Sequence, residues 1–130
     1  MKKIVWVVRG IKDYRIPVYN ALSGISDVEL HLIYNPSLSV SDLKRRLSTK
    51  IRLHEIDREL LIGPKDNNER MANTSIRVTY VPGIIPLLRR LRPHGIIVEG
   101  FFQYSLFGYV YKILTPGVKL ICSYERTIAY

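Results

Sequence analysis

The chain has 130 residues, 47% of them hydrophobic and 24% charged, which are the proportions of one folded domain rather than of a disordered chain. With 20 Lys and Arg against 11 Asp and Glu, its formal net charge is +9, which favours an anionic partner such as nucleic acid, an anionic membrane surface or a phosphorylated substrate. A single cysteine excludes a disulfide within the chain, and no apolar run reaches the roughly 18 residues needed to span a bilayer.

The apolar residues recur in patterns that alternate between strand and helix along the chain. Continuous β-branched runs are typical of strands buried on both faces of a parallel sheet, and apolar residues three or four apart mark one face of a helix. In chain order, these patterns and their breakers predict a strand over 4–8, a helix over 17–25, a strand over 28–34, a short basic helix over 42–47, one or two short strands within 51–62, a loop over 63–73, a strand over 76–80, a helix over 84–91, a strand over 95–100, a helix over 103–114 and a strand over 118–122.

Strands that alternate with helices predict an α/β fold with right-handed crossovers. We therefore expect a Rossmann-like three-layer domain with a parallel sheet in the order 3-2-1-4-5, in which the strand over 4–8 is central. Cys122 lies in the last apolar run and is expected to be a buried small hydrophobic side chain. The first apolar run is too short for an export signal and ends at Arg9, so the expected location is cytoplasmic, or peripheral on the inner face of a membrane.

Polar or glycine residues follow three of the predicted strands. In open α/β sheets, ligands bind beyond the carboxyl ends of the strands, so these three groups are expected to meet at one edge. Each also has an ordinary structural explanation: a solvated loop arginine, a glycine that permits a turn, or a carboxylate that caps a helix. The candidate residues are Arg9, Gly10 and Arg15 after the strand over 4–8, Glu99, Gly100, Phe101 and Tyr104 at the end of the strand over 95–100, and Glu125, Arg126 and Thr127 after the strand over 118–122.

Other chemistries have little support in the sequence. The glycine-rich phosphate-binding patterns and the nucleophile elbow G-x-S-x-G do not occur. The histidines, His31, His54 and His94, are scattered, so no metal site is expected.

Basic residues cluster in two places, at Lys44–Arg46 with Lys50 and Arg52 nearby, and at Arg89, Arg90 and Arg92. Either cluster is a solvated helix face or a binder of phosphates. Because no RNA-binding aromatic signature or helix-turn-helix pattern accompanies them, nucleic acid is not the favoured partner. Apolar and tyrosine-rich stretches nearby favour an anionic lipid surface instead.

Residues 14–22, Tyr-Arg-Ile-Pro-Val-Tyr-Asn-Ala-Leu, follow the first strand and a short loop. This segment resembles the start of family 4 glycosyltransferases, in which a YR-[IV]-P-x-[FY]-N-x-L segment opens the first helix. Residues 91–100 are similar to that family's L-x-P-D-[VI]-[VI] strand, which leads into a pocket-lining turn, with His94 in place of the aspartate. Residues 123–127, Ser-Tyr-Glu-Arg-Thr, look like the S-E-x-T strand end of one branch. The resemblance covers nearly the whole chain except about residues 40 to 75.

The resemblance implies one half of a GT-B architecture, in which two Rossmann-like domains face each other across a cleft. The front domain receives a glycan or lipid-linked acceptor, and the rear domain holds the nucleotide-sugar. Residues 1–130 are then an incomplete N-terminal, acceptor-side domain that is inactive alone, meets a nucleotide-sugar only with a missing C-terminal domain or partner chain, and needs no cofactor. Three alternatives stay open: a non-catalytic remnant, one subunit of a split enzyme, and a basic nucleic-acid-binding α/β domain.

The resemblance also assigns roles to the candidate residues. Arg9, Gly10 and Arg15 map to the loop that faces the cleft. Glu125 maps to a strand end where many relatives place a catalytic polar residue, and it is the candidate catalytic residue. The substrate-binding candidates at the other two strand ends are Glu99, Gly100, Phe101 and Tyr104, which map to the acceptor pocket, and Arg126 and Thr127.

Overall fold

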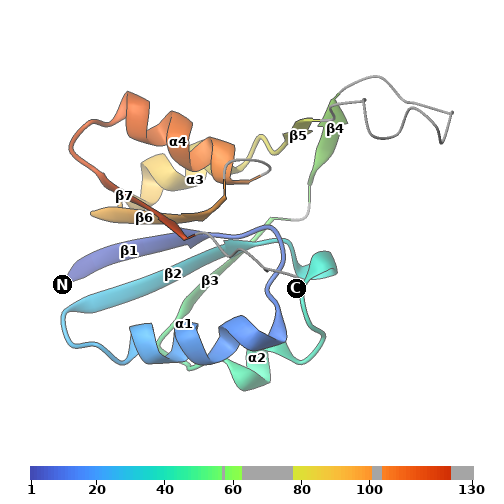
Figure 1. The fold of residues 1–130 in the computed structure, drawn as a ribbon, viewed down its shortest axis with the longest axis vertical. Coiled ribbons are helices and arrows are strands. Elements are labelled where there is room, and N and C mark those ends of the chain that lie inside the picture. Colours follow the sequence, from blue (N-terminus) through green and yellow to red (C-terminus); the bar gives the residue numbers. More distant parts are fainter. Residues whose placement is uncertain (57, 63–77, 101–103, 124–130) are drawn as a thin grey trace, which may run out of the picture.

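The structure, a computed structural model, describes residues 1–56, 58–62, 78–100 and 104–123 (Figure 1). Its helices and strands alternate as the sequence pattern predicts. They are β1 (Lys2–Val7), the 3-10 turn η1 (Asp13–Arg15), α1 (Ile16–Ser23), β2 (Val28–Tyr34), the 3-10 turn η2 (Pro36–Leu38), α2 (Leu43–Arg46), β3 (Arg52–Glu55), β4 (Leu60–Ile62), β5 (Val78–Tyr80), α3 (Ile84–Leu91), β6 (Gly95–Glu99), α4 (Ser105–Leu114) and β7 (Lys119–Ser123).

The main sheet has five parallel strands in the order β3-β2-β1-β6-β7, which confirms the predicted 3-2-1-4-5 order with the first strand in the centre. β4 and β5 pair antiparallel in a separate two-stranded sheet that extends from the body of the domain (Figure 1). The predicted loop over 63–73 lies outside the described residues. The basic helix predicted over 42–47 is a single turn, α2.

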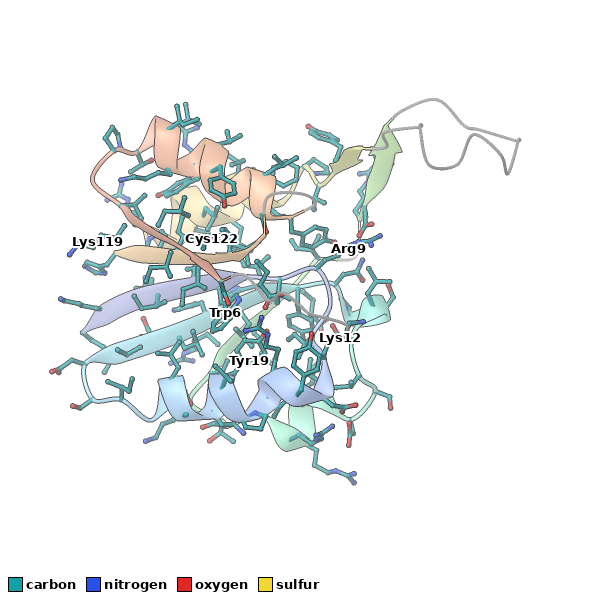
Figure 2. All side chains as sticks on the ribbon, in the orientation of Figure 1. Trp6, Arg9, Lys12, Tyr19, Lys119 and Cys122 are labelled. Atoms are coloured by element: carbon teal, nitrogen blue, oxygen red, sulfur yellow. The ribbon has the colours of Figure 1, made fainter. Side chains whose placement is uncertain are left out.

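Helices cover both faces of the sheet, so the domain has the three layers of a Rossmann-like fold: α1 and α2 lie on one face, and α3 and α4 on the other (Figure 1). The continuous apolar run in β1 serves both faces. Val5 and Val7 pack in the core on the α3 and α4 side, whereas Trp6 packs on the α1 side, edge to face against Tyr19 at a centroid distance of 4.8 Å (Figure 2). Because each side chain of this size stabilises the fold by about 1.5–3 kcal/mol when buried, β1 anchors both layers.

Helix α4 lies unusually close to the sheet at Gly108. A Cβ atom at this position would be 2.4 Å from Val98 Cγ1 in β6, nearer than real Cβ atoms come. The glycine therefore lets α4 pack directly on β6. It also fixes which side of α4 is buried: Ser105, Gly108 and Tyr111 lie against the sheet.

The prediction that Cys122 is buried is wrong, because its side chain is exposed. Cys122 belongs to β7, which is the edge strand next to β6. An edge strand has a neighbour on one side only, and the apolar run 118–122 does not reveal that position. No helix within the described residues is both long enough and apolar enough to cross a membrane.

Two of the three histidines are neighbours, which corrects the expectation that they are scattered. His31 in β2 and His54 in β3 stack at an interplanar angle of 10°, with His31 Nδ1 2.8 Å from His54 Nε2. The far nitrogen of His31, Nε2, lies 3.3 Å from Glu29 Oε2. Among the described residues no group of three or more His, Cys, Asp or Glu is placed to hold a metal ion.

Candidate functional site

A pocket opens between the carboxyl ends of β1 and β6. After β1 the chain continues to α1 on one face of the sheet, whereas α4, which follows β6, lies on the other face (Figure 1). This is the switch point at which open α/β sheets bind their ligands. The pocket has a volume of about 270 Å³ and is lined by Val7, Val8, Arg9, Gly10, Lys12, Tyr14, Leu38, Glu99, Tyr104 and Ser105.

Two glycines shape this edge for different reasons. At Gly10 a Cβ atom would be 2.5 Å from the carbonyl oxygen of Leu38, so the close approach of another backbone segment requires glycine there. Gly100 has a φ of +73°, and a Cβ atom at this position would meet nothing within 4 Å, so its left-handed backbone rather than any crowding requires glycine. Turn geometry therefore explains Gly100 but not Gly10.

A partly buried carboxylate, that of Glu59, holds two of the side chains that line the pocket, those of Arg9 and Tyr104. Its Oε1 accepts hydrogen bonds from Arg9 Nε at 3.1 Å and from Arg9 Nη2 at 2.6 Å. Its Oε2 accepts from Asn35 Nδ2 at 3.1 Å and from Tyr104 Oη at 2.8 Å. The side chain of Glu59 is only 12% exposed. Glu59 thus binds Arg9, which follows β1, Asn35, which follows β2, and Tyr104, which precedes α4.

The charge state of Glu59 follows from these contacts. Burial raises the pKa of its carboxyl group, whereas the hydrogen bonds from Arg9, Tyr104 and Asn35 lower it. The hydrogen bonds together outweigh burial, so the pKa of Glu59 lies below its ordinary value. Burial, followed by the hydrogen bond to Glu59, raises the pKa of the Tyr104 hydroxyl. At neutral pH an anionic Glu59 therefore accepts hydrogen bonds from two residues that line the pocket, through the Arg9 guanidinium and the neutral Tyr104 hydroxyl.

Arg15 ties together the ends of three strands. Its side chain is 11% exposed, and its Nε lies 3.6 Å from Glu99 Oε1 at the end of β6. Its Nη1 donates to Ser123 Oγ, at the end of β7, across 3.4 Å. The guanidinium also lies 5.7 Å from the centre of the Trp6 ring, at cation–π distance. Arg15 is therefore a structural cation of the sheet edge, not a solvated loop charge.

The structure brings together several of the sequence-predicted site residues. Arg9, Gly10, Glu99 and Tyr104 line the pocket, and Arg15 lies beside it in contact with Glu99. Gly100 follows Glu99 but does not line the pocket. Phe101, Glu125, Arg126 and Thr127 lie outside the described residues.

Glu59, Lys12, Asn35 and Ser105 are not among the site residues predicted from the sequence. Ser105 Oγ accepts from Glu99 N at 3.1 Å and donates to Glu99 O at 2.5 Å, so it ties the first residue of α4 to the last residue of β6. The position of Lys12 in the loop after β1 could have indicated it. Glu59 lies 50 residues from Arg9 in a segment without a motif, and nothing local marks it.

The pocket offers a ligand both donors and acceptors. Figure 2 shows Arg9 and Lys12 on the side of the molecule where the strands end. Lys12 has no ion pair among the described residues, whereas Glu99, with a 29% exposed side chain, supplies carboxylate oxygens. Tyr14, which is 64% exposed, adds an aromatic ring. Such a mixture suits a small ligand rich in hydroxyl groups.

Comparison with known protein families and with curated proteins gave no match for this chain. The Rossmann-like α/β assignment therefore rests on the sheet order and the helical layers themselves.

Proposed function

We propose that this chain is the acceptor-side, N-terminal domain of a GT-B-type glycosyltransferase, which moves a sugar from a nucleotide-sugar to a glycan or lipid-linked acceptor. The observation that carries the proposal is the polar pocket at the β1–β6 switch point. The residues that line it include Arg9 and Gly10, which the resemblance to family 4 glycosyltransferases assigns to the loop that faces the cleft. They also include Glu99 and Tyr104, which it assigns to the acceptor pocket.

The pocket chemistry supports an acceptor saccharide as the ligand. Glu99 accepts hydrogen bonds from sugar hydroxyls, Lys12 donates to them, and the exposed ring of Tyr14 offers an apolar surface to the C–H face of a sugar. The volume of about 270 Å³ is just below the roughly 300–1,000 Å³ of pockets for drug-sized ligands. It suits one saccharide unit better than a complete nucleotide-sugar.

In this proposal the donor is held by a second domain or a partner chain. Transfer needs donor and acceptor in near-attack geometry and basic groups that stabilise the charge on the departing nucleotide diphosphate. Arg9 is already engaged by Glu59 and Arg15 by Glu99. The chain alone is therefore expected to transfer no sugar. Glu125 remains the candidate catalytic residue of the proposal.

A transfer assay tests this assignment. The purified chain is incubated with labelled nucleotide-sugars and with glycan or lipid-linked acceptors, alone and together with a donor-binding chain. Product only in the combined reaction supports the acceptor-side role and indicates a split enzyme. Efficient transfer by the chain alone contradicts the proposal. A chain that binds no acceptor saccharide at all is a non-catalytic remnant.

A further inference from the structure

The outward side of α4 carries large aliphatic side chains. Ser105, Gly108 and Tyr111 occupy the side that packs on the sheet. On the opposite side Val110, Ile113 and Leu114 recur at helical spacing and are 44%, 78% and 63% exposed. A single exposed aliphatic residue is ordinary, but a contiguous group on one helix turn marks an interaction surface.

Two arginines that have no ion pair with any described residue lie beside this stripe. Arg89, in the last turn of α3, and Arg92, which ends that helix, line a cavity of about 370 Å³ together with Pro93, Tyr111 and Thr115. Neither arginine forms an ion pair within the part of the chain that the structure describes. Segments 89–98 and 104–123 contain no Asp or Glu at all, so nothing in either segment neutralises the positive charge.

The conformation of Arg92 is a further sign that its side chain is used. It ends α3 in the left-handed region, with φ 50° and ψ 61°. Helices that end in this conformation usually place glycine there, because other residues adopt it at a cost. The residue in this conformation is nevertheless an arginine, and it lines the cavity.

The other basic cluster is different. Lys44 Nζ lies 3.1 Å from Glu55 Oε1, and Arg45 Nη2 lies 3.8 Å from Asp42 Oδ2. Arg46 contacts both Asp13 and Asp42. The charge around α2 is therefore largely balanced inside the protein, which leaves the end of α3 as the stronger attraction for an external anion.

We propose that Arg89, Arg92, Val110, Ile113 and Leu114, here called the α3–α4 surface, dock this protein on an anionic lipid bilayer. The guanidinium groups bind lipid phosphates, whose oxygens match their planar fork of N–H donors. The aliphatic side chains enter the headgroup region, as they do in interfacial amphipathic helices. This chemistry distinguishes a membrane from a free phosphate, which uses the arginines but gains nothing from the aliphatic stripe.

The place of this surface in the fold is compatible with a working pocket. α4 runs antiparallel to the strands, so its last turn lies near their amino ends, whereas the pocket opens at their carboxyl ends (Figure 1). Docking through the α3–α4 surface leaves the pocket accessible. The inference does not depend on sugar transfer and can fail or hold without it.

Vesicle co-sedimentation tests the docking. The chain is mixed with vesicles of phosphatidylcholine alone and of phosphatidylcholine with phosphatidylglycerol, at low and at high salt. We expect binding to the anionic vesicles at low salt and release at high salt, because screening weakens attraction between exposed charges. Equal binding to both vesicle types, or binding to neither at low salt, would overturn the proposal.

Matched variants locate the contact. Arg89→Glu with Arg92→Glu should weaken binding about tenfold or more, given the contribution of each basic residue near an anionic surface. Lys44→Glu with Arg45→Glu makes the same change in net charge and should alter binding less than about twofold. Equal losses in the two double variants would mean that only net charge matters, and would overturn the assignment to the α3–α4 surface.

The aliphatic stripe has its own test. Ile113→Ser with Leu114→Ser should weaken vesicle binding several-fold at both salt concentrations, because the apolar contribution is not screened.

Competition with inorganic phosphate distinguishes a membrane from a free anion. At equal ionic strength, inorganic phosphate should release no more of the chain from the vesicles than sodium chloride does. Displacement by phosphate alone would identify a free-anion site and overturn the proposal. A concentration-dependent dimer that disappears in the serine variant would show that a second copy covers this face, with the same consequence.

Discussion

The two ends of the sheet use their arginines in opposite ways. At the carboxyl end Arg9 is held by Glu59 and Arg15 contacts Glu99, so the cations belong to a network of fixed geometry. On the α3–α4 surface Arg89 and Arg92 have no carboxylate partner among the described residues. A basic cluster in a sequence therefore has no single role. Its role depends on whether the fold brings an acidic side chain to it.

The largest effect on stability is expected from the removal of Glu59. Glu59→Ala should lower the free energy of unfolding by about 2–4 kcal/mol, because it leaves the Arg9 guanidinium and the buried Tyr104 hydroxyl without their shared acceptor. The partial exposure of Arg9 makes the lower part of that range the better expectation. Chemical denaturation measures the effect.

Asp13→Ala is the matched control. Asp13 also contacts an arginine, Arg46, but its side chain is 70% exposed. Its removal should leave the unfolding midpoint unchanged, since exposed pairs contribute little. Equal destabilisation by the two substitutions would remove the distinction between a built network and a surface pair.

A second, smaller effect is expected on acidification, at the histidine pair on the α3 side of the sheet. Burial, followed by repulsion from His31 and Arg90, lowers the pKa of His54 to about 4. Burial lowers the pKa of His31 as well. Because the unfolded chain binds protons at these sites below pH 6.5 and the folded chain resists them, stability present above pH 6.5 is lost as the pH falls towards 4.

The expected loss is on the order of 1–2 kcal/mol between about pH 6.5 and about pH 5, measured by denaturation at a series of pH values. This interval lies above the range in which Glu59 titrates, since its pKa is below the ordinary 4.5. His54→Gln should flatten the profile in the same interval. A wild-type profile with no slope there would contradict the burial of two neutral histidines.

The smallest effect concerns Arg92. Arg92→Gly should raise the free energy of unfolding by several tenths to about 1 kcal/mol, because glycine adopts the left-handed conformation without strain. The same substitution should weaken binding to anionic vesicles. Asp27→Gly is the control, since Asp27 has a φ of 69° far from the α3–α4 surface in sequence, and it should stabilise the chain with vesicle binding unchanged. If Arg92→Gly stabilises the chain and leaves vesicle binding unchanged, Arg92 has no role in docking.

The sequence predicted the layers and the order of the sheet because both follow from short-range pattern and chirality. A continuous apolar run such as 4–8 indicates a strand buried on both faces, and right-handed crossovers restrict the order. The exposure of Cys122 could not be foreseen in the same way. The run 118–122 resembles the run 95–100, but only long-range pairing decides that β7 is the edge.

Part of the candidate site could be predicted from the sequence, namely the residues that adjoin the ends of strands. Arg9, Gly10 and Glu99 adjoin strands, so the rule that ligands bind at the carboxyl ends of strands located them. Glu59 and the His31–His54 pair depend on contacts between segments distant in sequence. The pairing of Ile33 with His54 sets the histidine contact, and the sequence near either histidine does not specify that register.

The most direct test of the acceptor-side account is a binding measurement by NMR on the isotopically labelled chain. The account predicts that an acceptor saccharide, drawn from a panel of short glycans and lipid-linked sugars, shifts the backbone amide signals of Gly10, Lys12 and Ser105. Glu99→Gln should weaken that binding about tenfold, as expected for the loss of a charged hydrogen-bond acceptor. Nucleotide-sugars should leave these signals in place. Shifts at Gly10, Lys12 and Ser105 caused by nucleotide-sugars, with none caused by any saccharide, would contradict the account.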